Sequence, residues 1–218
     1  ENDPEMMWLT TMNPETRNFI DGRLVDASNG ATFPNVNPAT EEVIGVTADG
    51  TREDMDRAIG AARRAFDETD WWTNHALRKR CLEQLHRALV AAKEELREIV
   101  IAEAGAPLML AYTVQCDQTI EWMPFYAELA GSYAFEQPMA DMSFMGMVSR
   151  RIVRREAAGV VGAITPWNFP NAMITRKCGP TLAVGCGFVA RPAAETPLSA
   201  LALAVLGVVN ILHEPEVL

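Results

Sequence analysis

A short apolar segment that runs into a loop rich in proline and aromatic residues constrains this chain more than any other feature. Residues 159–164 read Gly-Val-Val-Gly-Ala-Ile, and residues 165–170 read Thr-Pro-Trp-Asn-Phe-Pro. Residues 173–182 then have the pattern of a helix. A buried strand, a loop and a helix in this order form the unit of open parallel α/β sheets. Binding and catalytic groups gather at the carboxyl ends of such strands, which is where residues 165–170 lie.

The segments that follow continue the α/β pattern. Residues 188–190 predict a second parallel strand, residues 197–206 predict a helix that starts at a favourable proline, and residues 208–212 predict a third strand. No Gly-x-Gly-x-x-Gly is present in the chain.

The first half of the chain predicts short strands and then packing helices. Residues 17–49 alternate short apolar runs with turn residues, which indicates two or three strands. Thr51 followed by Asp54 forms a capping-box pair that starts a helix. A longer amphipathic helix is expected from about Asn74 to Gly105. Residues 108–133 are again helical, with a break at Pro124, and residues 135–156 predict an exposed hairpin.

Charge and cysteine content exclude several classes of function. The net charge is −10, and residues 1–70 carry 15 acidic but only 6 basic side chains. No broad basic face is present, which argues against a nucleic-acid partner. No apolar run is long enough to predict a membrane span, and no signal peptide pattern opens the chain. The four cysteines lack paired spacing and predict reduced thiols in a cytoplasmic protein.

The loop at 165–170 allows two interpretations. Asn168 is an amide donor fixed beside a strand end, and such a donor suits the stabilisation of a developing oxyanion. The other interpretation is a stiff turn in which Trp167 is only an aromatic lid. The residues alone leave both open.

The run Ile-Thr-Pro-Trp-Asn-Phe-Pro at 164–170, with Met-Ile-Thr-Arg-Lys at 173–177 and Ala-Val-Gly-Cys at 183–186, closely resembles the aldehyde dehydrogenase superfamily. The resemblance implies an α/β fold with an incomplete Rossmann-type parallel sheet, N-terminal helices and a β-hairpin oligomerisation arm. It implies N-terminal strands and helices of the cofactor-binding domain at 1–136, the arm at 137–158 and the first part of the nucleotide-binding sheet at 159–218, with the catalytic domain absent.

The resemblance also implies roles for particular residues. Asn168 matches the oxyanion donor, and Lys177 matches a lysine beside the active site. Arg176 matches an arginine that holds the substrate carboxylate in the succinate-semialdehyde branch, and a surface arginine is the equally weighted alternative. The residues that would line the cofactor path are Ile164, Thr165, Pro166, Trp167, Arg191 and Ala194.

Two of these positions depart from the strict NAD pattern. Arg191 stands in place of a lysine, and Ala194 stands in place of a glutamate on the ribose hydroxyls. Loss of that carboxylate removes repulsion against a 2′-phosphate, so NADP is at least as plausible a cofactor as NAD.

The sequence also lacks parts of the resembled family. The 218 residues contain no cysteine in a Gly-Gln-x-Cys setting and no Glu-Leu-Gly-Gly segment. Cys178 lies beside Lys177, but it falls one position off the helix register that points toward the site. We therefore expect a truncated aldehyde dehydrogenase with weak or absent cofactor binding. It would form a homo-oligomer through the arm and would act on a small aldehyde, and a separate catalytic-domain chain is a further expected partner. The alternative is a catalytically inactive paralogue that serves as a binding or assembly module.

Overall fold

The computed structural model describes residues 17–211. Two antiparallel strand pairs, β1 with β2 and β3 with β4, open the described part, and one parallel pair, β9 with β10, follows the helices. The bounds of these strands are β1 Asn18–Ile20, β2 Arg23–Val25, β3 Thr32–Val36, β4 Val43–Ala48, β9 Val160–Ile164 and β10 Gly187–Arg191.

Helices make up most of the rest of the described chain. They are α1 Arg52–Glu68, α2 His75–Ala91, α3 Lys93–Ala104, α4 Leu108–Leu110, the π-helix η3 Ala111–Gln115, α5 Asp117–Glu121, α6 Met123–Ser132, α7 Pro170–Ala183 and α8 Pro197–Ile211. The helix that starts at Thr51 has both hydrogen bonds of the expected capping box with Asp54. The helix expected from Asn74 to Gly105 is instead two helices, because Ala92 leaves helical geometry between α2 and α3.

The third strand predicted for residues 208–212 is wrong. Helix α8 continues from Pro197 to Ile211, and Leu212 lies outside the described residues. Gly207 separates the predicted helix from the predicted strand, but one glycine costs a helix only about 1 kcal/mol and does not by itself stop it. Among the described residues the parallel sheet therefore consists of β9 and β10 alone.

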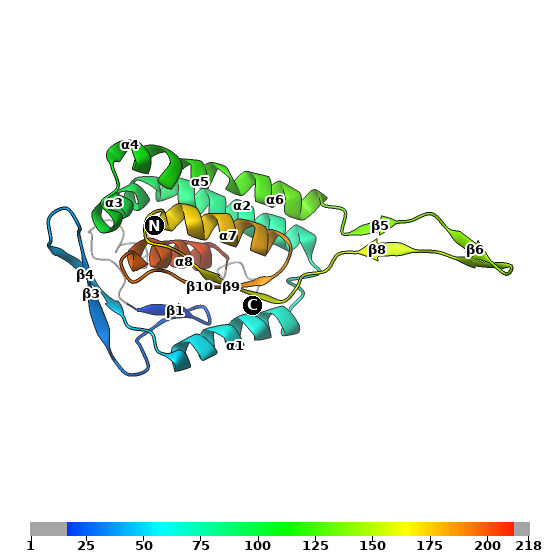
Figure 1. The fold of residues 1–218 in the computed structure, drawn as a ribbon, viewed down its shortest axis with the longest axis horizontal. Coiled ribbons are helices and arrows are strands. Elements are labelled where there is room, and N and C mark those ends of the chain that lie inside the picture. Colours follow the sequence, from blue (N-terminus) through cyan, green and yellow to red (C-terminus); the bar gives the residue numbers. More distant parts are fainter. Residues whose placement is uncertain (1–16, 212–218) are drawn as a thin grey trace.

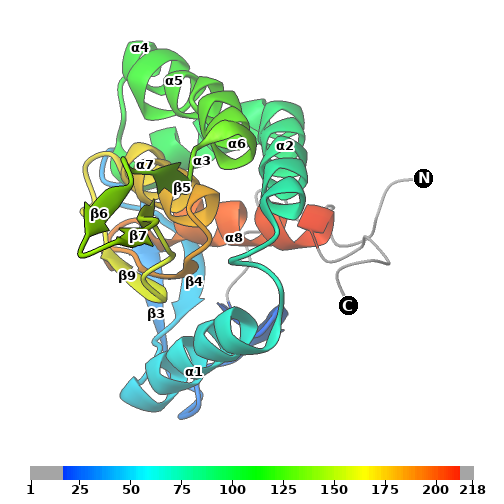
Figure 2. The same ribbon diagram turned by 90° about the vertical axis from the view of Figure 1, so that its right-hand side faces the viewer.

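The main core lies among the helices. Figures 1 and 2 show α2 beside α6, with α8 packed below them. The apolar side chains that fill this space are almost fully buried and come from five helices: Leu82, Leu85, Leu89, Leu96, Ile120, Met123, Ala202 and Leu206. This rigid helical body supports α7, which covers one face of the β9–β10 pair, while α1 covers the other face (Figure 1).

A long two-stranded arm projects from this body (Figure 1). Strand β5 (Glu136–Pro138) pairs with β8 (Ile152–Arg154), and β6 (Met142–Phe144) pairs with β7 (Met147–Ser149), all antiparallel. Met145 and Gly146 at the tip both have positive φ, as a tight hairpin turn requires. The predicted exposed hairpin is confirmed, because every strand residue of the arm is exposed. No helix among residues 17–211 is long and apolar enough to cross a membrane.

Candidate active site

The loop after β9 lies at the carboxyl edge of the parallel pair. Val160 to Ile164 pairs in register with Gly187 to Arg191, so both strands end at the same level. The backbone N–H of Thr165 then donates to the carbonyl of Arg191 at 3.1 Å. Thr165 is buried, and this hydrogen bond joins the carboxyl ends of the two strands.

The residues around Thr165 face solvent. Ile164 is 76% exposed although it belongs to a parallel strand, where side chains are normally covered on both faces. Trp167 is 54% exposed, and Pro166 and Asn168 are also exposed. This edge is an apolar and amide-bearing surface that no other described residue covers.

Helix α7 begins directly after this loop. Pro170 and Asn171 form its first turn, and the preceding Phe169 gives no side-chain cap. Asn168 therefore stands beside backbone N–H groups at the positive end of a helix dipole, a setting that favours negative charge. Within residues 17–211 the side-chain amide of Asn168 has no hydrogen-bond partner of its own, so it is free to donate.

Arg176 and Lys177 lie further along α7, and both are exposed. No contact within the described chain joins either of them to Asn168. The guanidinium of Arg176 lies over the indole ring of Trp122, 4.5 Å from the ring centroid. Trp122 comes from the junction of α5 and α6, so tertiary packing creates this contact.

Cys178, which lies on α7 directly after Lys177, has an unreactive environment. Cys178 is half-buried as a residue, and burial of its thiol raises the pKa to about 12. A nucleophilic cysteine requires a depressed pKa. All four cysteines lie in the described part, and none forms a disulfide there.

The other end of the edge is formed by the loop between β10 and α8. Arg191 and Ala194 are exposed there. Two buried side chains from distant parts of the sequence hold this connection in place. The side-chain amide of Asn35 donates to the carbonyl of Glu195 at 3.0 Å. The carboxylate of Glu103 accepts from the N–H groups of Leu198 and Ser199, each at 2.8 Å.

Sequence reasoning missed Trp122, Asn35 and Glu103. Asn35 sits in a strand and Glu103 near the end of a helix, where polar residues are commonplace, and nothing in the sequence shows that they are buried. It also missed Asn171, which is 1% exposed and whose two amide atoms have no partner among the described residues. A polar residue between apolar neighbours at the start of α7 was the only available signal.

Comparison with known proteins gives a consistent family. The sequence profile described as "Aldehyde dehydrogenase family" matches residues 24–210. The chain is 40% identical over 193 residues to 3-sulfolactaldehyde dehydrogenase of Pseudomonas putida, covering 86% of this chain and 37% of the relative. It is 36% identical over 203 residues to the mitochondrial aldehyde dehydrogenase of Homo sapiens, covering 88% and 38%.

Solved structures agree with the sequence comparisons. Betaine aldehyde dehydrogenase of Staphylococcus aureus in complex with NAD+ superimposes with a TM-score of 0.83 at 30% identity, covering 93% of this chain and 39% of that one. The chain therefore spans about two fifths of the length of the proteins that it matches. The fold predicted from the sequence is confirmed.

Proposed function

Because this chain belongs to the aldehyde dehydrogenase family, we propose that it forms the cofactor-facing part of an NAD(P)-dependent enzyme that oxidises an aldehyde to a carboxylic acid. The observation that carries the proposal is the parallel β9–β10 pair, whose carboxyl ends meet through the Thr165–Arg191 hydrogen bond. Dinucleotides bind at the carboxyl ends of strands in open α/β sheets.

The residues at this edge fit the adenosine side of a dinucleotide. Ile164 and Trp167 offer uncovered apolar surface for a base, and Arg191 offers an exposed cation for a phosphate. Thr165 fixes the position of the loop between them. Ala194 carries no negative charge, so a 2′-phosphate meets no repulsion at that position. We infer that NADP binds no worse than NAD.

The chain's own contribution to the chemistry is the stabilisation of charge. The Asn168 amide, beside the N-terminus of α7, would donate to the oxyanion that develops on the aldehyde oxygen when a nucleophile attacks the aldehyde carbon. The cofactor, when bound, accepts hydride. We do not assign Cys178 as the nucleophile, because burial raises the pKa of its thiol and so disfavours the reactive thiolate. We propose that a nucleophile and a general base from outside these 218 residues complete the site.

The substrate that we propose carries an anionic group besides its aldehyde, as succinate semialdehyde does. Arg176 and Lys177 place two exposed cations on α7, two turns beyond the loop of Asn168. The relative from Pseudomonas putida is named for 3-sulfolactaldehyde, an aldehyde with a sulfonate. Carboxylate and sulfonate both suit the forked donors of a guanidinium.

Titration of NAD+ and NADP+ into the chain, by calorimetry or NMR, tests this proposal. We expect a dissociation constant on the order of millimolar, because no glycine-rich loop cradles the pyrophosphate. Arg191→Gln should weaken NADP+ more than NAD+, and Ala194→Glu should shift the preference toward NAD+. Succinate semialdehyde added to either mixture should give no reduced cofactor above a buffer blank.

Three results would contradict the proposal. A clear preference of the parent chain for NAD+ would refute the roles of Arg191 and Ala194. Micromolar affinity would mean that other residues replace the glycine-rich loop. Sustained turnover that is lost in Cys178→Ser would refute our account of the nucleophile.

A further inference from the structure

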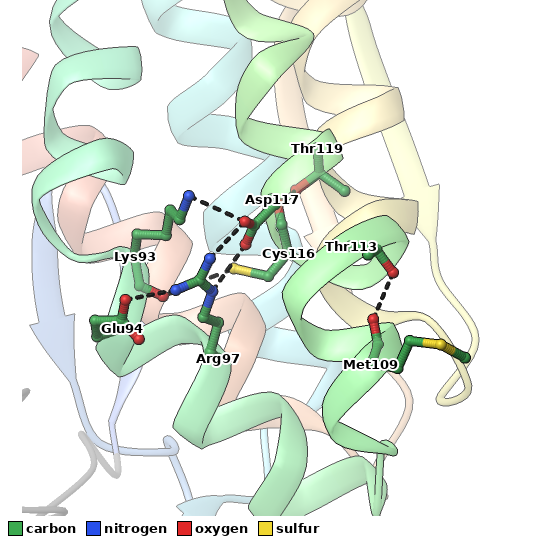
Figure 3. A network of polar contacts seen from close by, with 8 residues as sticks. All are labelled: Lys93, Glu94, Arg97, Met109, Thr113, Cys116, Asp117 and Thr119. Carbon is green, nitrogen blue, oxygen red and sulfur yellow. Dashed lines mark hydrogen bonds and ion pairs between the residues drawn. The ribbon is translucent and has the colours of Figure 1, made fainter.

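Four arginines of the described chain lie over aromatic rings, and the two with the shortest distances to the ring centroid, Arg97 and Arg176, differ in their hydrogen-bond partners. The guanidinium of Arg97 lies 4.0 Å from the ring centroid of Tyr112, and that of Arg176 lies 4.5 Å from that of Trp122. The N–H edge of Arg97 is occupied: it donates to Asp117 at 2.8 and 2.5 Å and to Glu94 at 2.5 Å (Figure 3). Within the described part of the chain, Arg176 has no ion pair and no hydrogen-bond partner.

This difference matters because of guanidinium geometry. The five N–H donors lie in the plane of the group, so an aromatic ring against its face orients the cation without using a donor. Arg97 thus shows, within the same molecule, a stacked arginine whose N–H groups donate to carboxylates. Arg176 has the stacked face and an open edge on an exposed part of α7.

The packing of α6 against α7 sets the Arg176–Trp122 register. Gly179 is so close to Tyr126 that a Cβ there would lie 2.3 Å from the tyrosine ring. Helices α6 and α7 run in the same direction in Figure 1. Tyr126 comes one helical turn after Trp122, and Gly179 comes about one turn after Arg176. The close contact at Gly179 therefore aligns the preceding turns, where Trp122 meets Arg176.

Residues on both sides of Trp122 in the chain are fixed by packing and ion pairs. The next residue, Met123, is 1% exposed in the helical core. Helix α5, which leads into Trp122, begins at Asp117, and Asp117 is tied to α3 by Arg97 and by Lys93 at 3.0 Å (Figure 3). The indole is thus attached to a rigid part of the molecule rather than to a loop.

We propose that Trp122 is the positioning residue for Arg176. It holds the guanidinium flat against the indole, so that the open N–H edge donates hydrogen bonds to two oxygens of a carboxylate or sulfonate at the far end of the substrate. This inference rests on the proposed function, in which Arg176 receives the anionic group. It adds a determinant of substrate selection that lies on a different helix and forms no bond to the substrate.

NMR of the ¹⁵N-labelled chain with succinate as the probe tests the inference. The Arg176 Nε–Hε signal, identified by its absence in Arg176→Lys, should lie upfield because of the indole ring current. Trp122→Leu should abolish that displacement, and Trp122→Phe should reduce it. Trp122→Leu should also raise the dissociation constant for succinate about two- to five-fold, the range expected from an exposed cation–π contact.

The matched control is Phe125→Leu, which removes an aromatic ring less than one turn away. Phe125 is 64% exposed and contacts Tyr126, with ring centroids 5.5 Å apart, rather than Arg176. This variant should leave both the Arg176 signal and the succinate affinity unchanged.

The outcomes separate the two hypotheses. If Arg176→Gln weakens succinate binding and Trp122→Leu does not, Trp122 has no positioning role and the proposed function stands. An Arg176 signal at an ordinary position in the parent chain would equally refute the inference. If Arg176→Gln leaves succinate binding unchanged, the anionic substrate of the proposed function is wrong, and the inference falls with it. Should Trp122→Leu fail to fold, the smaller displacement in Trp122→Phe decides the question.

Discussion

Among the acidic residues between positions 17 and 211, Glu103 is the one whose surroundings raise its pKa most. It lies in the last turn of α3, is 3% exposed, and accepts hydrogen bonds from the first turn of α8. Burial raises the pKa of its carboxyl group to about 7, although the hydrogen bonds from Ser199 and Leu198 work in the opposite direction. One side chain thus caps the N-terminus of a distant helix, at the cost of keeping a carboxyl group out of water.

This raised pKa predicts a pH dependence of stability. The unfolded chain loses the Glu103 proton near pH 4.5, whereas the folded chain retains it to about pH 7. The free energy of unfolding should therefore fall by about 3 kcal/mol at most as pH rises from 4.5 to about 7. Below pH 4.5 protonated Glu103 makes its full contribution to stability. Glu103→Gln cannot titrate and should lack this fall. Urea denaturation at several pH values measures it.

Glu98→Gln is the matched control for Glu103→Gln. It makes the same change of charge on the same helix, at an exposed position. Its pH profile should follow that of the parent chain. Parallel profiles for Glu103→Gln and the parent would show that Glu103 is not responsible.

At the scale of elements, the connection from α3 to α6 depends on one ionic cluster. Short α4, the π-helix η3 and short α5 follow one another here, and none is long enough to be stable alone. Arg97 reaches from α3 to Asp117 at the start of α5, and its side chain is only 9% exposed (Figure 3). Although burial acts to raise it, Arg97 and Lys93 hold the pKa of Asp117 below its ordinary value.

We predict that Asp117→Asn destabilises the chain by about 2 kcal/mol, because it leaves the mostly buried charge of Arg97 with a weaker partner. Urea denaturation near pH 7 measures the change. Asp67→Asn breaks the exposed Arg63–Asp67 pair of α1 and should leave the unfolding midpoint unchanged. Equal effects of the two substitutions would mean that the cluster adds nothing beyond a surface ion pair.

At the scale of the whole molecule, the arm is the part that the rest of the described chain does not cover. Its paired strands extend away from the body (Figure 1) and carry eight exposed large apolar side chains: Met139, Met142, Phe144, Met145, Met147, Val148, Ile152 and Val153. A two-stranded ribbon with open edges and so much apolar surface is a site for pairing with another chain.

We predict that the chain forms dimers or larger species through this arm. Light scattering after size-exclusion chromatography should show a mass above that of one chain, and the double substitution Phe144→Glu, Val148→Glu should lower it. Ile59→Glu and Val90→Glu, which change exposed apolar residues on α1 and α2, serve as controls and should leave the mass unchanged. A monomer across a wide concentration range would contradict the prediction.

The sequence by itself determined the local structure wherever interactions between residues a few positions apart are enough to fix it. The Thr51–Asp54 capping box, the new helix with Pro124 in its first turn and the hairpin of the arm were all predictable. The ordered motif at 164–177 was specific enough to indicate the family and the strand–loop–helix unit of the candidate site. Backbone sterics and hydrogen bonds between residues a few positions apart decide such features.

Only the tertiary structure decided the features that depend on distant partners. Three of the four residues 208–211 are β-branched, yet the backbone continues α8 there, because local propensity is only a weak preference. Trp122 meets Arg176 across 54 positions of chain, and Glu103 caps a helix that begins 94 residues later. Burial and the identity of a contact partner are properties of packing, and no local pattern carries them. For this reason the motif gave the candidate site residues, and the fold alone gave the side chains that position them.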